Sequence, residues 1–463
     1  MTKKLLRSFA LAIATIMLAV ACNSDTQLYD DGVVRRSPSE TDVLQIWWDK
    51  GFNPEEDEAL ERLVDNWEQK TGNKAKINFY TLEARTKKPQ RYLQNGIAPD
   101  MFMSFKAEST LNPSLAWSGK LTDVTDVIEP VKAIYDPQAL KTTHYYNSVT
   151  QKRSYYAVPI HRGVVHVYYW KNLLEKTGRT PADIPRDWDD FWQFWLEVGK
   201  DLQTKHQQNI YPLGLPMSVE AGDTYQAFEH ILEAYDVRLL DSTGKLLLDN
   251  PNVRQGIIKC LNWYSQFYKQ GYVPQDAVDW TNADNNRLFL NQNILMTTNA
   301  SMSIPAAVRN DSDTYHNKLG IVELPNKLNG KPMRHIFLVE QAVIFNDALH
   351  PELAKDFLAY LIQPEILNQF LKESGRHSPA QTTAYQDSYW SNPQDIHVSE
   401  VTKTLTQGDI RPIYPANSPA YSVVLKENIW GQSLENIVLN DVTSEQAADE
   451  AIARIEEIFA DWQ

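Results

Sequence analysis

The stretch that decides the fold is Tyr92-Leu93-Gln94-Asn95-Gly96-Ile97-Ala98-Pro99-Asp100-Met101-Phe102-Met103-Ser104-Phe105. It predicts a helix that ends at Gly96, a tight turn held by Asp100, and a short buried strand that starts at Met101. A helix leading directly into a buried strand is typical of a doubly wound sheet, where ligands bind beyond the carboxyl ends of the strands. We therefore expect Phe105 and Lys106 to face a cleft.

The preceding residues predict the rest of one α/β unit. Residues 43–48 and 75–80 have the apolar pattern of strands. Between them, an amphipathic helix begins at Asn53 and Pro54 and stops at Gly72. Strand, helix, strand, helix and strand in quick succession require a parallel sheet.

The length of the chain predicts two such units. At 463 residues it is too long for one hydrophobic core. We expect an α/β fold of two lobes, each a central, mostly parallel sheet flanked by helices. Residues 43–160 and 313–346 are assigned to the N-lobe, and residues 161–312 and 347–463 to the C-lobe. Several chain crossings would form a hinge between them, the first at residues 160–163.

Two further patterns concern packing. Residues 319–324 and 335–339 are expected to pair as antiparallel strands. Trp188, Phe191, Trp192 and Trp195 share one face of a predicted helix. Such a stripe could form a platform for a sugar, but at helical spacing it is far more often part of the core.

The N-terminus predicts export. Basic residues precede an apolar run that is too short to span a membrane, so residues 1–21 are interpreted as a signal peptide. Leu18-Ala19-Val20-Ala21-Cys22 resembles the lipobox of bacterial lipoproteins, which predicts lipidation of Cys22, although Ala19-Val20-Ala21 also suits the ordinary signal peptidase. Residues 22–42 are polar and are expected to be a flexible tether. Cys260, the other cysteine, is expected to be buried and inert.

The charge excludes one class of partner. The formal net charge is -14, and 43% of the residues are hydrophobic, which indicates a globular, acidic protein. Binding to nucleic acid requires a basic surface that neutralises phosphates. We therefore expect no nucleic-acid partner.

Taken in order, segments along almost the whole chain resemble the extracellular solute-binding proteins of ABC importers, specifically the sugar-binding family that includes maltose-binding protein. The matching segments are the export signal, Gly96-Ile97-Ala98-Pro99-Asp100-Met101-Phe102, Gly119-Lys120-Leu121-Thr122-Asp123, Tyr156-Ala157-Val158-Pro159, Val167-Tyr168-Tyr169-Trp170-Lys171, Ile294-Leu295-Met296-Thr297-Thr298-Asn299, Pro351-Glu352-Leu353-Ala354-Lys355-Asp356-Phe357 and Thr443-Ser444-Glu445-Gln446-Ala447-Ala448. Two segments depart from the family pattern. Ala300-Ser301-Met302 replaces a glycine followed by an aromatic residue, and Trp170-Lys171 replaces an Asn-Lys pair.

The resemblance implies a function as well as a fold. Members close two lobes around a carbohydrate and deliver it to a membrane permease, with no chemistry and no cofactor of their own. We therefore expect a periplasmic or cell-envelope protein, monomeric and lipid-anchored, that binds a carbohydrate, most plausibly an oligosaccharide. No metal site is expected.

A sugar site needs aromatic faces for stacking and planar polar groups for paired hydrogen bonds. Loops at predicted strand ends that carry both types supply the candidate ligand-binding residues. They are Trp48, Asp49, Glu83, Arg85, His161, Arg162, Trp280, Asn282, Asn299, His335, Arg376 and Tyr414.

Two alternatives stay open. One is an exported enzyme that acts on polysaccharide, which would need two carboxylates facing each other across the sugar. The sequence has no His-Glu-x-x-His helix and no Gly-x-Ser-x-Gly elbow. The other is a binding protein of the same fold for a different solute, such as a polyamine, an iron complex or a peptide.

Overall fold

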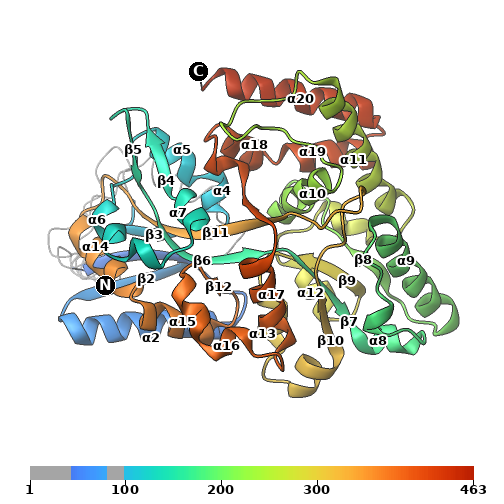
Figure 1. Cartoon of the computed structure of the whole chain (residues 1–463), viewed down its shortest axis with the longest axis horizontal. Helices are drawn as coiled ribbons and strands as arrows, with labels where there is room; N and C mark the ends of the chain where they lie inside the picture. Colours follow the sequence, from blue (N-terminus) through green and yellow to red (C-terminus); the bar gives the residue numbers. More distant parts are fainter. Residues whose placement is uncertain (1–42, 81–97, 463) are drawn as a thin grey trace, which may run out of the picture.

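The computed structural model describes residues 43–80 and 98–462, which form two large sheets side by side, a separate two-stranded sheet, and helices around them (Figure 1). The predictions for the signal peptide, Cys22, the tether and the helix ending at Gly96 lie outside these residues, as do Glu83 and Arg85. None of the helices in the described ranges is long and apolar enough to cross a membrane.

The first sheet has the strand order β12-β6-β11-β3-β1-β2, and β13 also pairs with β11. Its strands are β1 (Val43–Asp49), β2 (Lys74–Tyr80), β3 (Met101–Met103), β6 (Val158–Val164), β11 (His335–Ile344), β12 (Ser378–Pro379) and β13 (Ile410–Pro412). The parallel β2-β1-β3 unit confirms the βαβαβ prediction for its described part. By contrast, β11 runs antiparallel to both β3 and β6, so the sheet is mixed rather than mostly parallel.

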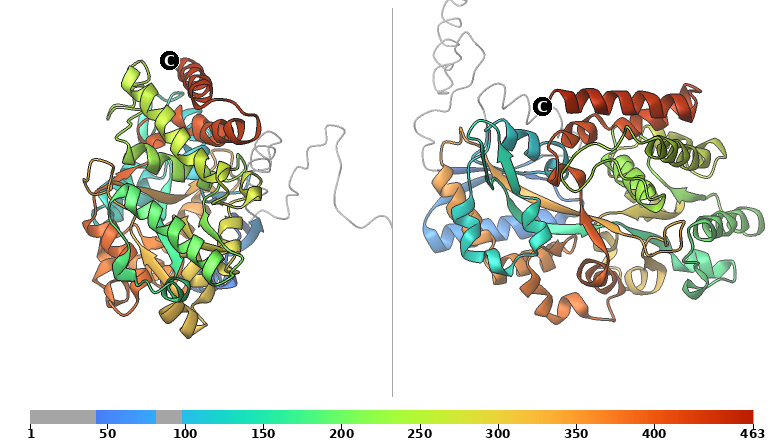
Figure 2. Two further views of the ribbon diagram at one scale, coloured as in Figure 1. Left: turned by 90° about the vertical axis from the view of Figure 1, so that its right-hand side faces the viewer. Right: turned by 45° about the horizontal axis from the view of Figure 1, so that its top comes forward.

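Alternating side chains place helices on both faces of this sheet. Ile46 of β1 and Met103 of β3 belong to the same core cluster as α2 (Pro54–Thr71), whereas Phe102 belongs to a second cluster with Leu115. The remaining elements of this half are α4 (Ala107–Thr110), α5 (Asn112–Trp117), α6 (Thr125–Ile128), α7 (Pro137–Lys141), the hairpin β4 (His144–Asn147) and β5 (Lys152–Tyr155), α14 (Pro351–Leu361) and α15 (Pro364–Ser374). Figure 2 shows them around the sheet.

The turn predicted at Asp100 is confirmed. The Asp100 carboxylate is fully buried and accepts hydrogen bonds from the backbone N–H of Gln45 (2.8 Å) and of His350 (3.0 Å). It therefore joins β1 to the start of α14, and its role is structural, as expected.

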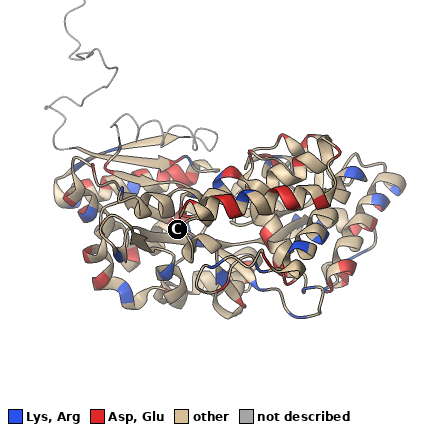
Figure 3. Cartoon of the chain, turned by 90° about the horizontal axis from the view of Figure 1, so that it is seen from above, with Lys and Arg blue, Asp and Glu red and all other residues tan. Residues whose placement is uncertain are grey.

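The second sheet has the order β10-β7-β9-β8, in which only β8 and β9 are parallel. Its strands are β7 (His166–Trp170), β8 (Tyr211–Gly214), β9 (Ile294–Asn299) and β10 (Leu319–Val322). The helices of this half are α8 (Lys171–Lys176), α9 (Trp188–Lys205), α10 (Gly222–Ala234), α11 (Pro251–Lys269), α12 (Asp284–Leu290), α13 (Ser303–Val308), α16 (Ser388–Ser391), α17 (Ile396–Gln407), α18 (Tyr421–Glu427), α19 (Ile429–Leu439) and α20 (Ser444–Ala460). Viewed from above, basic and acidic residues are interspersed over the helices of both halves (Figure 3).

The chain passes between the two halves several times in the described region. It leaves β6 for β7 at Val165, connects β10 to β11 through residues 323–334, leaves β12 for α16, returns from α17 to β13, and leaves β13 for α18. The first crossing was expected at residues 160–163, but these residues lie within β6. The pairing predicted between residues 319–324 and 335–339 is wrong, because β10 pairs with β7 in the second sheet while β11 enters the first.

The C-terminal third is shared between the halves. Trp67 of α2 packs on Phe357 of α14 with ring centroids 5.3 Å apart, so α14 belongs beside the first sheet. By contrast, α19 and α20 pack against α11. Sequence placed residues 347–463 in one lobe because helical periodicity reports which face is buried, not which core it joins.

The aromatic helix and the cysteine behave as expected. The four residues of the stripe in α9 are buried in the core, as is Cys260 of α11. Burial raises the pKa of the Cys260 thiol well above its usual value, which suits an inert side chain. Residues 421–439 form two helices rather than one, because Asn428 takes a left-handed conformation (φ 48°) between α18 and α19.

A buried ion cluster secures two of the crossings. Glu233 of α10 pairs with Arg334 (2.8 Å) and Lys327 (2.5 Å) on the connection between β10 and β11, and with Arg411 of β13 (3.1 Å). Burial opposes ionisation of this carboxyl, but the bonds from Arg334 and Lys327 outweigh it and lower the pKa of Glu233 to about 2.

Replacing Glu233 tests this cluster. Glu233→Gln should lower the free energy of unfolding by about 3 kcal/mol at pH 7, because it leaves three cations without their shared partner. The carboxylate stabilises the fold above its unfolded pKa of about 4.3, and this contribution disappears as the pH falls toward 2. Urea unfolding at pH 7 and pH 3 measures both effects, with exposed Glu450→Gln as the control. A deficit of equal size at both pH values would contradict the pKa shift.

Candidate functional site

The two halves face each other across a cleft at the carboxyl ends of β1 and β3, the position expected for a ligand in a sheet of this kind. A cavity of about 50 Å³ lies in it. Its lining residues are Phe52, Phe105, Lys106, Leu338, Glu340, Arg376 and His377 from the first half, and Asp223, Gln226, Asn282, Ala283, Asn286, Asn299, Ala300, Ser301 and Ser303 from the second. Phe105 and Lys106 thus face a cleft, as predicted.

Asp49 positions the first wall. Its buried carboxylate, at the end of β1, accepts hydrogen bonds from the backbone N–H of Phe105 (2.5 Å) and the hydroxyl of Ser104 (3.2 Å) at the end of β3. These bonds hold the turn that presents Phe105 to the cleft. The guanidinium of Arg376 lies over this ring, 4.0 Å from the Phe105 centroid, and pairs with Glu56 (3.0 Å).

Lys106 joins the two walls. Its backbone is left-handed (φ 67°), and its ammonium donates to Asp223 at the start of α10 (2.5 Å) and to the side-chain oxygen of Asn282 (2.7 Å). A Cβ at Gly222 would lie 2.9 Å from this ammonium nitrogen, so glycine leaves room for the contact. A second contact across the cleft runs from the amide of Asn53 to the carbonyl of Ser303 (3.3 Å).

Amides and hydroxyls form the second wall. Asn299, the last residue of β9, donates to the side-chain oxygen of Asn286 (2.5 Å) and accepts from the backbone N–H of Ser301 (2.8 Å). Asn286 in turn donates to the hydroxyl of Ser303 (3.0 Å). The network fixes planar polar groups at the cleft, where they can exchange hydrogen bonds with a polar guest.

The floor carries two histidines and two glutamates. His161 of β6 lies opposite Glu340 of β11, and its Nδ1 is 3.2 Å from a Glu340 oxygen. The ring of His377 stacks on that of His161 with centroids 3.8 Å apart. Burial, and then the nearby charge of Glu340, raise the pKa of Glu108 well above its usual range, so its neutral form is favoured.

The structure brings together some of the candidate residues predicted from sequence. Asn282, Asn299 and Arg376 line the cleft, His161 lies at its floor, and Asp49 supports it from behind.

Five other candidates lie elsewhere. Trp48 packs in the core against Phe370, and Trp280 is also a core residue. Arg162 points to the opposite side of β6 from His161, where it pairs with Asp136 (2.9 Å) and donates to the Pro379 carbonyl (3.0 Å).

His335 and Tyr414 are likewise buried away from the cleft. His335 stacks near His166, and burial lowers its pKa to about 4. The Tyr414 hydroxyl accepts from the backbone N–H of Leu239 (3.3 Å), and Arg411 lies over the Tyr414 ring.

Several lining residues escaped the sequence reasoning. Asp223 and Gln226 lie in the first turns of α10, Asn286 lies in α12, and Glu340 lies inside a long buried strand. The sequence does contain a signal for two of them, namely a charged residue at an unusual position. Glu340 interrupts an apolar run, and acidic Asp223 lies at the start of a helix immediately after Gly222. The sequence search favoured loops, and these residues lie in helices and a strand.

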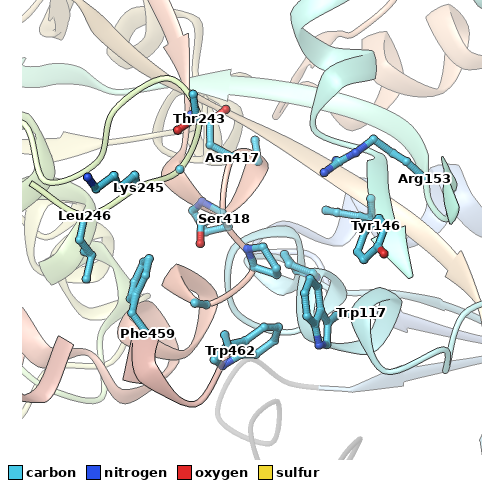
Figure 4. A pocket seen from close by; sticks show the side chains of 17 residues that line it. Trp117, Tyr146, Arg153, Thr243, Lys245, Leu246, Asn417, Ser418, Phe459 and Trp462 are labelled. Carbon is cyan, nitrogen blue, oxygen red and sulfur yellow. The ribbon is translucent and has the colours of Figure 1, made fainter. Parts of the chain in front are cut away.

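A larger cavity, of about 450 Å³, also has walls from both halves (Figure 4). The rings of Trp117 and Trp462 lie 5.2 Å apart at its edge, and Tyr146 packs on Trp117 at 5.5 Å. Arg153 and Lys245 lie on opposite sides of it. Its polar groups are fewer than those of the cleft, and it is formed by α5, the β4–β5 hairpin, two loops and the C-terminal end of α20 rather than by parallel strand ends.

Solved structures share the whole architecture. A solute-binding protein of an ABC transporter from Thermotoga lettingae, bound to α-D-tagatose, superposes with a TM-score of 0.75 at 20% identity over 90% of this chain and 99% of that one. Maltose-bound MalE3 of T. maritima gives 0.72 at 18% identity over 90% and 100%. A sugar transporter from Arthrobacter chlorophenolicus with bound laminaribiose gives 0.71 at 13% over 90% and 99%. At these identities the likeness shows the fold.

Sequence comparison identifies the family. No curated protein sequence matches the chain. The family of bacterial extracellular solute-binding proteins matches residues 53–366, more than half of the chain. The chain therefore belongs to the bacterial extracellular solute-binding protein family.

Proposed function

We propose that the protein binds a carbohydrate in the cleft between its two sheets and delivers it to the permease of an ABC importer. The observation that carries the proposal is the lining of the cleft. The aromatic ring of Phe105 lies beside planar amide, carboxylate and guanidinium groups drawn from both halves. This combination suits a polyhydroxylated ring, which has both an apolar face and many hydroxyls. The family and the sugar-bound structural neighbours support the same class of ligand.

Binding requires the halves to move. A space of about 50 Å³ accommodates a few water molecules and is far below the roughly 300 Å³ at which ligand pockets begin. The direct bonds from Lys106 to Asp223 and Asn282 close it. A sugar therefore enters an open form and replaces these contacts with its own hydroxyls, and its differential affinity for the two forms shifts their populations.

We further propose that the protein acts by binding without turnover, as an exported monomer at the cell envelope. A binding screen determines whether the bound sugar is an oligosaccharide or a shorter sugar. A thermal-shift screen of mono- and oligosaccharides tests the proposal, because a ligand that binds the folded form raises its melting temperature. A sugar that is cleaved during incubation would favour the polysaccharide-active enzyme, and a response only to non-sugar solutes would favour the other alternative.

Matched aromatic substitutions distinguish the two cavities. Phe105→Ala should weaken binding of the screened sugar by at least about tenfold, since removing a stacking anchor costs more than about 1.4 kcal/mol. Trp117→Ala, in the larger cavity, should leave the affinity within about twofold. Isothermal titration calorimetry on both folded variants measures the effect. If only Trp117→Ala lost affinity, the result would indicate that the sugar binds in the larger cavity and not in the cleft.

The anchor has its own test. We propose that Cys22 is acylated, on the basis of the lipobox-like sequence that precedes it. The wild-type protein expressed in a bacterial host should incorporate labelled palmitate and fractionate with membranes, and Cys22→Ser should do neither. A soluble, unlabelled wild-type protein would instead favour cleavage by the ordinary signal peptidase.

A further inference from the structure

Three side chains with metal-ligating atoms converge at the floor of the cleft. His161 lies on β6, Glu340 on β11 and His377 directly before β12, three adjacent strands of the first sheet. The strand register aligns His161 with Glu340 on one side and with Pro379 on the other. Backbone pairing, rather than a mobile loop, therefore brings the three groups together.

We propose that His161, Glu340 and His377 bind a zinc ion at the floor of the cleft. Their ligating atoms all lie within 4.8 Å of one another. His161 Nδ1 is 3.2 Å from one Glu340 oxygen, and His377 Nε2 is 3.8 Å from the other. A zinc ion about 2.0–2.2 Å from each ligand in tetrahedral geometry separates the ligand atoms by roughly 3.2–3.6 Å. The two distances from the histidines to Glu340 are thus at or close to this range, whereas the limit of 4.8 Å for the whole set lies above it.

One adjustment completes the geometry. The two imidazole rings are stacked, with an interplanar angle of 13° and centroids 3.8 Å apart. Two parallel rings cannot both direct an in-plane lone pair at one ion, so one imidazole must rotate about its χ angles when the ion binds. The change is confined to a side chain, because the strands already fix the backbone.

The local charge favours a cation. Glu340 has only His161 and His377 as ion-pair partners in the described part of the chain. The nearest basic side chains are already engaged, Arg376 with Glu56 and Lys106 with Asp223. A divalent ion would neutralise this buried acidic charge, which is costly to leave uncompensated.

The three side chains also supply ligand atoms of the types that zinc binds in proteins. Two imidazoles and one carboxylate are a ligand set that zinc uses in proteins, with the fourth tetrahedral position left open.

Three protein ligands leave the fourth position open. Glu340 and His377 both line the cleft, so the open position faces the space that a guest would enter. A hydroxyl or carboxylate oxygen of the guest could complete the coordination. The zinc site itself does not rest on the carbohydrate proposal, because its ligands are present whatever solute the cleft binds.

Titration of the full chain with zinc chloride alone tests the proposal. After dialysis against EDTA, calorimetry should give one zinc ion per chain with a dissociation constant in the micromolar range or below. His377→Gln, which keeps the size and polarity of the side chain, should weaken binding by at least about 100-fold. His206→Gln alters an exposed histidine of the second half and should have no effect.

A spectroscopic arm guards against a folding defect. Cobalt substituted for zinc should give visible ligand-field absorption in the wild type and in His206→Gln, and none in Glu340→Gln or His377→Gln, while far-ultraviolet circular dichroism stays unchanged in all four proteins. Absence of stoichiometric zinc binding to the wild type would overturn the proposal. So would equal zinc affinity in the wild type and His377→Gln, which would place the ion elsewhere.

Discussion

The structure depends on the insertion of β11 between β3 and β6. All ten residues of this strand are buried, and it pairs antiparallel with both neighbours while β13 joins its first residues. The strand comes from residues 335–344, far in sequence from β3, so the first sheet is completed by a segment that follows the strands of the second half in the chain. This one pairing makes the crossings obligatory, and it places Glu340 beneath the cleft.

The cleft follows from that arrangement. The parallel strands β1 and β3 end at the same edge, where Asp49 fixes the turn that carries Phe105 and Lys106. The second half meets this edge with the start of α10 and the end of β9. Since the halves touch there mainly through polar side chains, such as Lys106 with Asp223, a hydroxyl-rich solute can replace the contacts without leaving buried groups unpaired. The ion cluster at Glu233 joins α10 to the connection between β10 and β11 through Arg334, and to β13 through Arg411.

Sequence predicted the local structure well and the long-range structure less well. The βαβ unit and the aromatic core of α9 follow from patterns among neighbouring residues, and both were confirmed. The partners of residues 319–322 and 335–344 depend on pairing between distant segments, which no local pattern reports. The candidate ligand-binding residues lie partly at the cleft and partly in the core for a related reason. An aromatic or charged residue at a strand end, such as Trp48 or Arg162, gives the same sequence pattern whether its side chain faces a cleft or the core. Period-2 alternation shows that successive side chains point to opposite faces of a sheet, but it does not show which face lines the cleft.

The family fold and the cleft together make a single mechanical claim, that two halves open and close around a solute. Small-angle X-ray scattering measures this most directly, since hinge closure changes the radius of gyration of the whole molecule. With a saturating sugar from the binding screen, the account predicts that the radius of gyration decreases and that the scattering profile approaches the one calculated from the closed structure. An unchanged profile at saturation would contradict the account, because the sugar would then occupy the protein without moving its two halves.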